Sequence, residues 1–342
     1  MAMKAIQSIP DDPLEELRIR HTRLSNLMSD LACLLGSKGD ILAILGPTGV
    51  GKSVLNEYLV KTALKDAAEE MQANPALLPA ILIEAESSGE EKFSWRSFYQ
   101  DILEQLGEDI TMPRQNYDID PVTGRLVRAR YTNTNTLSGL RKAVVKALKA
   151  RKVQFLVIEE AAHIFSQCSA RKLLIQLNTL KSLSNTSGAQ LVLAGSYDLY
   201  ELVSLSGQLA RRIQVIHFSR YREDVDADVR AYRACLQQCQ AVHKGLWGNS
   251  LMEHADVLME NTIGCIGTLT SVLKHAVKFA ASRGGWSLDV LEAALLTEDQ
   301  REKILLEVLE GERRIEPGIT RDLRLHKKTT HKVTSKIHQE AA

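Results

Sequence analysis

Residues Gly46 to Ser53 read GPTGVGKS, which has the form G-x-x-x-x-G-K-[ST] of a phosphate-binding loop. They follow the apolar run Ile41–Leu45 and precede a stretch from Val54 that is compatible with a helix. Glycines let backbone N–H groups turn toward a triphosphate, and the N-terminus of the next helix adds the positive end of its dipole. The sequence therefore predicts a nucleoside triphosphate bound by these residues: Gly46, Pro47, Thr48, Gly49, Val50, Gly51, Lys52 and Ser53. Lys52 would pair with the β- and γ-phosphates, and the Ser53 hydroxyl would ligate Mg²⁺.

Two carboxylates follow a second apolar strand. The predicted strand Val153–Ile158 runs into Glu159 and Glu160, which is the Walker B arrangement. The first acid helps to hold the Mg²⁺ shell, and the second can orient or deprotonate the attacking water. The usual pair is Asp-Glu, so Glu159 is one methylene longer, which we expect to weaken Mg²⁺ positioning and slow hydrolysis. The alternative is a strand end with two solvated acids.

Three further residues have positions from which they could reach the γ-phosphate. Ser196 follows the predicted strand Gln190–Gly195, and we expect it to act as a sensor of that phosphate; a simple cap of the strand is the alternative. Arg211 and Arg212 precede the last predicted strand, Ile213–His217. From a neighbouring subunit, either arginine could act as an arginine finger, or both could form a solvated surface pair. The sequence does not choose between the two arginines.

The composition restricts the class of protein. The 342 residues are enough for about two domains, and 44% hydrophobic with 25% charged residues is typical of a soluble globular protein. The net charge of +1 gives no global sign preference, so any nucleic-acid surface must be local. We expect no membrane span and no signal peptide, because no apolar segment is long enough. Five cysteines form no disulfide framework, which favours a location in the cytoplasm.

Strands and helices alternate up to the last predicted strand. The predicted helices span residues 12–35, 54–72, 93–106, 137–150 and 171–183, and the predicted strands span 41–45, 80–84, 153–158, 190–195 and 213–217. Residues 107–137 are polar and rich in turn-forming residues, so we predict a long loop there. The alternation predicts an α/β fold, in which helices sandwich a parallel sheet that carries the P-loop.

From about Ser219 the pattern is helical as far as Glu310, which predicts a small C-terminal all-helical lid domain. We therefore divide the chain into an N-terminal helical segment (1–35), an AAA+ ATPase core (36–218), the lid (219–315) and a basic tail (316–342). The tail has few apolar residues, and we expect it to be disordered.

Other uses of a phosphate-binding loop fit less well. A GTPase would carry the guanine-reading N-K-x-D pattern after the loop, but its only echo, Ser37–Asp40, lies before it. Small kinases, which transfer a phosphoryl group, share the loop but are not indicated by the helical C-terminal region or by the paired arginines. The helical C-terminal region and the paired arginines favour an AAA+ ATPase that uses ATP and Mg²⁺.

The ordered set of motifs resembles the TniB/TnsC family of transposition regulators. The matching segments are His21–Leu24 (HTRL), Pro79 with Ile81–Ala85, Phe98–Gly107, Val157–Phe165, QLARRIQVI at 208–216, Thr262–Gly267 and Trp286–Glu312. The resemblance covers about residues 14–312. This chain departs from the family at Glu159, and its lid helix begins Thr268-Leu269 without the arginine that many AAA+ proteins use as a second sensor. Both departures imply slow ATP turnover, as in a switch more than a motor.

The resemblance implies an oligomer that ATP assembles on double-stranded DNA and that links target selection to a transposase. The family's partners are a DDE transposase and a TniQ-type target selector, and some members serve CRISPR-associated transposons. A head-to-tail contact that does not close gives a filament. Contacts to DNA phosphates would be independent of base sequence. Our candidates for them are Arg125, Arg128, Arg130 and Thr132 in the predicted loop, with Lys142 and Lys146 on the next helix. A solvated charged loop is the alternative.

Two other functions stay open at this point. A replication-type AAA+ loader or initiator would carry a winged-helix domain after the lid, and we expect the residues beyond Gly285 to be too few for one. A nucleotide-gated signalling scaffold would not bind DNA at all.

Overall fold

The computed structural model describes residues 14, 17–19, 21–36, 40–87, 93–108, 117–119, 126–128, 136–165, 170–200, 213–248 and 250–315. For 117–119, 126–128 and 170 it describes the backbone alone. None of the helices in these ranges combines the length and the apolar composition that crossing a membrane requires.

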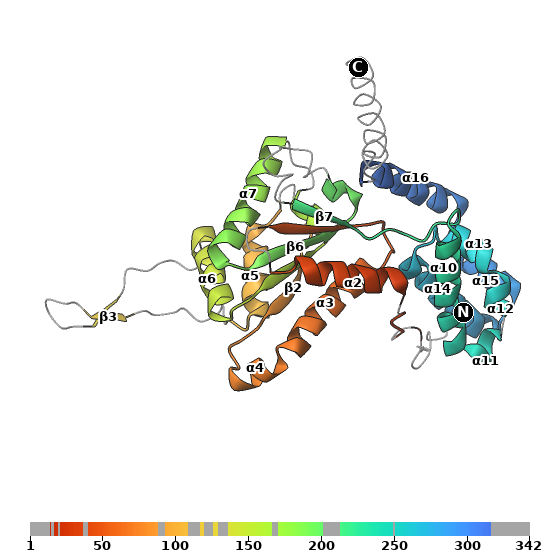
Figure 1. Ribbon diagram of the computed structural model, residues 1–342, viewed down its shortest axis with the longest axis horizontal. Coiled ribbons are helices and arrows are strands. Elements are labelled where there is room, and N and C mark those ends of the chain that lie inside the picture. The colour runs from red at the N-terminus through yellow and green to blue at the C-terminus, as the bar shows by residue number, and fades with distance from the viewer. Residues whose placement is uncertain are drawn as a thin grey trace, which may run out of the picture.

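A five-stranded parallel sheet forms the centre of the first part of the chain (Figure 1). Its strands are β1 (Ile41–Leu45), β2 (Ala80–Glu84), β5 (Phe155–Glu159), β6 (Gln190–Gly195) and β7 (Ile213–His217), in the spatial order β2-β5-β6-β1-β7. The central strands β1 and β6 are buried along their whole length, as expected for parallel strands covered on both faces. Because all strands are parallel, their carboxyl ends meet at one edge. The predicted α/β fold is confirmed.

Helices cover both faces of the sheet. On β1, Ile41, Ala43 and Leu45 belong to one hydrophobic core, and Leu42 and Ile44 belong to the other, since neighbouring side chains of a strand alternate between faces. The first core is completed by α5 (Trp95–Gln105), α6 (Leu137–Ala150) and α7 (Ala170–Ser187), and the second by α2 (Thr22–Leu34) and α3 (Lys52–Asp66).

The region after β7 is helical, as predicted. It contains α10 (Asp226–Val242), α11 (Lys244–Trp247), α12 (Ser250–Glu253), α13 (Ala255–Asn261), α14 (Ile266–Arg283), α15 (Leu288–Ala294) and α16 (Glu298–Ile315). We call these helices the lid. Helices α10 to α15 share a hydrophobic core that includes Tyr232, Leu236, Leu269 and Leu273. The boundaries of the four predicted segments stay a prediction.

Three predicted elements differ from the structure. Residues 12–35 do not form one helix, because α2 begins only at Thr22 and residues 17–19 and 21 are not helical. The predicted helix over 54–72 is interrupted at Ala67, between α3 and α4 (Ala68–Ala73). The predicted loop over 107–137 contains an antiparallel pair, β3 (Tyr117–Ile119) and β4 (Leu126–Arg128). Arg128 therefore lies in a strand, opposite Tyr117.

Candidate nucleotide-binding site

The phosphate-binding loop joins β1 to α3 with the geometry that its glycines predict. Gly49 and Gly51 have φ of 77° and 112°, which glycine adopts without steric cost. Helix α3 begins at Lys52, directly after Gly51, and Ser53 is exposed in its first turn. A Cβ atom on Gly46 would lie 2.4 Å from the carbonyl oxygen of Phe218, so only glycine fits there. The loop therefore presents the N-terminus of a long helix, which favours an anion.

Lys52 lies over the loop that precedes it. Its Nζ donates hydrogen bonds of 2.9 Å to the carbonyl oxygens of Gly46 and of Pro47. Burial lowers the pKa of Lys52, while nearby negative charges, that of Glu160 first, act in the opposite direction. A phosphate anion at the loop would favour the charged ammonium in the same way.

The two acids lie at the carboxyl edge of the sheet. Glu159 is the last residue of β5, and its Oε1 accepts a hydrogen bond of 2.9 Å from Nδ2 of Asn56 in α3. Glu160 is exposed and has φ 46° and ψ 37°, a left-handed conformation that costs a non-glycine residue about 1–2 kcal/mol. The turn that results lets the backbone N–H of His163 donate to the Glu160 carbonyl, and it starts the 3₁₀-helix η1 (Ala161–Ile164).

The predicted sensor, Ser196, follows β6, which lies between β5 and β1. Its Oγ donates to a carboxylate oxygen of Asp198 at 3.4 Å, and its carbonyl accepts from Leu199 at the start of the 3₁₀-helix η2 (Tyr197–Tyr200). Ser196 is thus at the same edge as Glu159 and the phosphate-binding loop. Arg211 and Arg212 lie outside the described residues.

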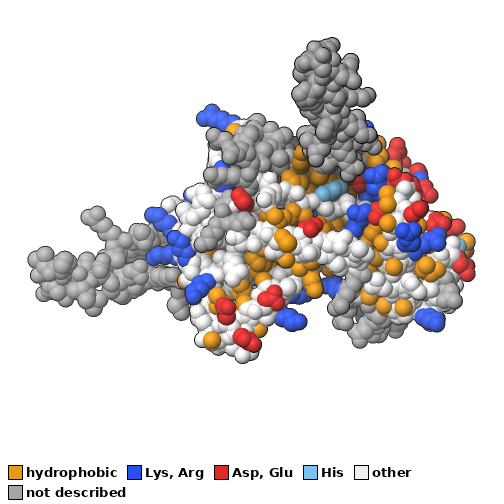
Figure 2. Space-filling view, viewed as in Figure 1, with side chains coloured by type: hydrophobic (Ala, Val, Ile, Leu, Met, Phe, Trp, Pro, Cys, Tyr) orange, Lys and Arg blue, Asp and Glu red, His pale blue; other side chains and the backbone are white. Residues whose placement is uncertain are grey.

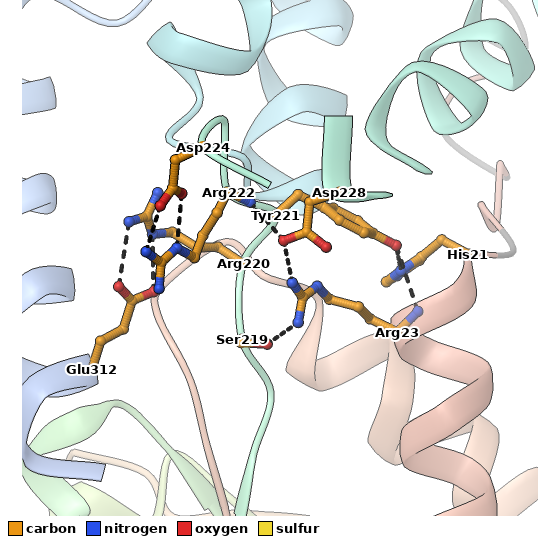
Figure 3. A network of polar contacts seen from close by, with 9 residues as sticks. All are labelled: His21, Arg23, Ser219, Arg220, Tyr221, Arg222, Asp224, Asp228 and Glu312. Carbon is orange, nitrogen blue, oxygen red and sulfur yellow. Dashed lines mark hydrogen bonds and ion pairs between the residues drawn. The ribbon is translucent and has the colours of Figure 1, made fainter. Parts of the chain in front are cut away.

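An aromatic wall, made by His21, Phe218 and Tyr221, lies beside the loop, and the sequence did not predict it. Phe218 is fully buried, donates its N–H to the Leu45 carbonyl and places its ring next to Gly51. The ring of His21 stacks on the ring of Phe218, with the two centroids 6.1 Å apart and the two planes at 18° to each other. Nδ1 of His21 lies 2.9 Å from the Tyr221 hydroxyl (Figure 3). Burial first, and then the charge of Arg23, lower the pKa of His21 to about 4, so its imidazole is neutral near pH 7.

Arg23 fixes this wall to the segment after β7. Its guanidinium donates to Ser219 and to Asp228, and lies over the Tyr221 ring at 5.0 Å (Figure 3). The backbone N–H of Arg222 also donates to Asp228, at 2.9 Å. In the sequence, the HTRL segment marks His21 and Arg23, but it does not indicate which residues they contact.

The lid contacts the phosphate-binding loop directly. The backbone N–H of Thr268, in the first turn of α14, donates to the Gly49 carbonyl at 3.0 Å. A Cβ on Gly267 would lie 2.6 Å from the same oxygen, which explains the glycine. From α16, the negative charge of Glu307 also acts on Lys52. The loop therefore lies between the edge of the sheet and the first turn of α14.

The candidate DNA contacts are only partly within the described residues. Lys142 and Lys146 are exposed on α6, and Lys149 shares their face. Figure 2 shows Lys and Arg side chains at the end of the molecule where α6 and α7 lie. The side chain of Arg128 is not described, and Arg125, Arg130 and Thr132 lie outside the described residues.

Comparisons with known proteins bear on the domain that carries this site. Residues 36–203 match the protein-family model described as "AAA domain". No curated protein matches the sequence. The Walker-type ATPase PABY2304 of Pyrococcus abyssi has a similar structure, with a TM-score of 0.51 and 15% identity over 89% of this chain and 80% of that chain. The family match supports an AAA+ ATPase, and the structural likeness supports the fold.

Two more distant structures also align. Drosophila ORC bound to DNA has 12% identity, covers 85% of this chain and 71% of that chain, and has a TM-score of 0.42. The Hsp104–ADP complex of S. cerevisiae has 13% identity, covers 92% of this chain and 46% of that chain, and has a TM-score of 0.44. Neither TM-score is high enough to support an inference about this chain.

Proposed function

We propose that this chain is an ATP-dependent, DNA-binding regulator of transposition of the TniB/TnsC type. It assembles head to tail on double-stranded DNA, and it links a TniQ-type target selector to a transposase. Slow hydrolysis of ATP limits the lifetime of the assembly. The proposal therefore has a nucleotide part and a DNA part.

The nucleotide part rests on the residues around the loop, which fit a magnesium nucleotide. The loop supplies a helix N-terminus and a half-buried ammonium, and two carboxylates lie at the same sheet edge. Ser53 and Glu159 would hold Mg²⁺, which supplies neutralisation of the phosphate charge. In hydrolysis Glu160 orients the attacking water and accepts its proton, while Lys52 keeps its charge against the phosphates. Ser196, with Arg211 or Arg212 of a neighbouring protomer, contacts the γ-phosphate.

The slow rate that we propose rests on two local features. Glu159 replaces the shorter aspartate, so its carboxylate extends one bond further from β5. The first turn of α14 carries Thr268 where many AAA+ proteins have an arginine, and its backbone N–H is already bonded to Gly49. Fewer cations then act on the γ-phosphate from within the protomer, which favours a long-lived ATP state.

The observation that carries the DNA part is the charge of α6. Residues 137–152 contain six basic residues and no Asp or Glu. Leu140, Val144 and Leu148 pack into the core, so Lys142 and Lys146 face outward. A row of lysines without acidic neighbours on its own helix suits DNA phosphates, and the contacts need no base sequence.

The test is fluorescence anisotropy with duplex DNA at several salt concentrations, in ATP and in ADP. Wild-type protein should bind more tightly in ATP. The double variant Lys142→Ala/Lys146→Ala should bind more weakly, and its plot of log affinity against log salt should lose about two units of slope. The matched control, Lys65→Ala/Lys303→Ala, removes two exposed lysines from α3 and α16 and should bind as wild type does.

Two outcomes would contradict the DNA part. Binding that is the same in ATP, in ADP and without nucleotide would leave a nucleotide-gated scaffold as the better reading. An unchanged salt slope for the α6 variant would remove this helix from the interface. Electron microscopy with duplex DNA and a nonhydrolysable ATP analogue would then show whether rings or filaments form.

A further inference from the structure

Asn56 is a buried polar residue next to the candidate site that none of the roles above uses. It is in α3, one helical turn after Ser53, so both side chains lie on the same side of the helix. Its side chain is fully buried, with 0% exposure. Its Nδ2 donates to Oε1 of Glu159 at 2.9 Å, across 103 positions of the chain.

The hydrogen bond fixes the orientation of the Asn56 amide. A carboxylate can only accept, so the NH₂ group of the amide must face Glu159. The amide oxygen then faces away, and among the described residues Oδ1 of Asn56 has no hydrogen-bond donor. A buried acceptor without a partner destabilises a fold relative to an apolar residue of the same shape. The unpartnered oxygen therefore offsets what the hydrogen bond to Glu159 adds to stability.

We propose that Asn56 is a positioning residue that holds the Glu159 carboxylate for the Mg²⁺ of a bound nucleotide. Glu159 has one more rotatable bond than the aspartate that is usual at this position. Holding its carboxylate in one orientation therefore costs more conformational entropy. The bond from Asn56 removes that freedom at Oε1 and leaves Oε2 for the metal shell. Carboxylates near a metal are commonly oriented in this way by a second residue. This inference rests on the nucleotide part of the proposed function.

The experiment measures nucleotide binding, without turnover. The affinity for a fluorescent, nonhydrolysable ATP analogue is determined with Mg²⁺ and with EDTA, and the ratio of the two affinities reports the coupling between metal and nucleotide. The variant Asn56→Leu keeps the shape of the side chain and removes both the donor and the unpartnered oxygen. Its coupling ratio should fall about 10-fold, while its affinity in EDTA stays unchanged.

Thermal unfolding separates positioning from a structural role. Asn56→Leu should melt at or above the wild-type temperature, because no polar atom is left unsatisfied. The matched control is Asn261→Ala, which removes another buried asparagine whose amide bonds both the N–H and the carbonyl of Leu296 in the lid. That control should melt at a lower temperature and keep the wild-type coupling ratio. A lower melting temperature of Asn56→Leu, with an unchanged coupling ratio, would overturn the proposal.

A double-mutant cycle tests whether Asn56 acts through Glu159. In a Glu159→Gln background, Asn56→Leu should have no further effect on the coupling ratio, and an equal loss there would overturn the proposal. If the wild-type protein itself binds the analogue equally in Mg²⁺ and in EDTA, the nucleotide part of the proposed function fails, and this inference fails with it. If the wild type shows coupling and Asn56→Leu retains it, only the inference fails.

Discussion

Glu160 is the residue at which the candidate site departs most from relaxed backbone geometry. Its φ of 46° is left-handed, and strain of this kind persists only where the surrounding structure imposes it. After burial, the charge of Glu160 has the largest effect on the pKa of Lys52, which it raises. These two facts fit a carboxylate held where a water would attack, which is the role that we propose for it.

The first prediction concerns that role. Glu160→Gln should lower the rate of ATP hydrolysis by about 10²–10⁴-fold, because the amide cannot accept a proton. ATP binding should be kept, since the phosphate-binding loop is unchanged. Phosphate release and analogue binding are the measurements. Glu84→Gln is the control, because Glu84 ends the adjacent strand β2, is exposed and pairs in register with Glu159. Equal loss in both variants would contradict the assignment.

The second prediction concerns pH and His21. The native pKa of about 4 lies below the ordinary 6.5. Between these values the unfolded chain binds a proton that native His21 does not, so stability is full above pH 6.5 and falls toward pH 4. The loss is about 1–3 kcal/mol, allowing for partial exposure.

Urea unfolding at about pH 7 and at about pH 5 measures this loss. His21→Phe should show a smaller decrease between the two values, because the ring still stacks on Phe218 but cannot be protonated. A decrease equal to that of the wild type would assign the pH dependence to other groups.

The sequence predicted the candidate site where its residues are contiguous. The loop Gly46–Ser53 and the pair Glu159-Glu160 are each read from a strand end and the residues that follow. Asn56 could not be found in this way, because its partner is 103 positions away. Arg23 and Asp228 are 205 positions apart. Contacts of this range depend on how the elements pack, which the local pattern does not contain.

Among the predicted elements, the N-terminal helix differs most from the structure, and the reason is tertiary packing. Leucines at helical spacing predict one helix over 12–35, yet Leu14 and Ile19 belong to the lid core, and Leu27 and Leu31 pack beneath the sheet. One straight helix cannot contribute to both cores, and the backbone of His21, directly before α2, is extended. The strands were predicted nearly as they are, because their apolar runs are short, buried and bounded by polar residues.

The third prediction concerns the connection from α13 to α14. Gly264 has φ 68°, and a Cβ there would lie 1.8 Å from the Tyr221 carbonyl oxygen. Gly264→Ala should therefore lower the free energy of unfolding by about 2–4 kcal/mol. Chemical denaturation measures the change. Gly245→Ala, in α11, is the control, because a Cβ at Gly245 has no neighbour within 4 Å. It should change stability by no more than about 1 kcal/mol.

Comparable losses in the two glycine variants would contradict the assignment of the loss to the contact with Tyr221, because alanine is favoured over glycine at the helical position of Gly245. A loss confined to Gly264→Ala would support close contact between the lid and the segment after β7. The repeated glycines of Thr262–Gly267 then have separate partners, since Gly264 lies against Tyr221 and Gly267 lies against Gly49.

At the scale of the whole molecule, α16 returns from the lid to the edge of the sheet. Gly311 lies so close to Tyr197 of η2 that a Cβ would be 2.1 Å from its ring. The Tyr197 hydroxyl lies 2.9 Å from Nε2 of His217, at the end of β7. Next to Gly311, Glu312 binds Arg220 in the segment after β7 (Figure 3). Through α16, the lid thus contacts the residues that follow Ser196.

The fourth prediction concerns the ion pair of this junction. Nε of Arg220 lies 2.9 Å from Oε1 of Glu312, and the side chains are 12% and 10% exposed. Arg220→Ala leaves a buried carboxylate without its partner and should lower the free energy of unfolding by about 3–5 kcal/mol. Replacing both residues, Arg220→Met with Glu312→Leu, should restore most of that loss, because no buried charge remains. Chemical denaturation of the three proteins measures both effects.

An exposed ion pair of the lid serves as the control for this junction. Arg233 and Asp256 are 2.8 Å apart but 47% and 80% exposed, so Arg233→Ala should cost less than about 1 kcal/mol. If Arg220→Ala cost no more than Arg233→Ala, the junction would be solvated and α16 would be free to leave the sheet edge. If Arg220→Ala lowers the free energy of unfolding strongly and the double replacement recovers it, then α16 is held at the sheet edge by burial. The lid and the sheet would then respond to a nucleotide as one body, since both contact the phosphate-binding loop.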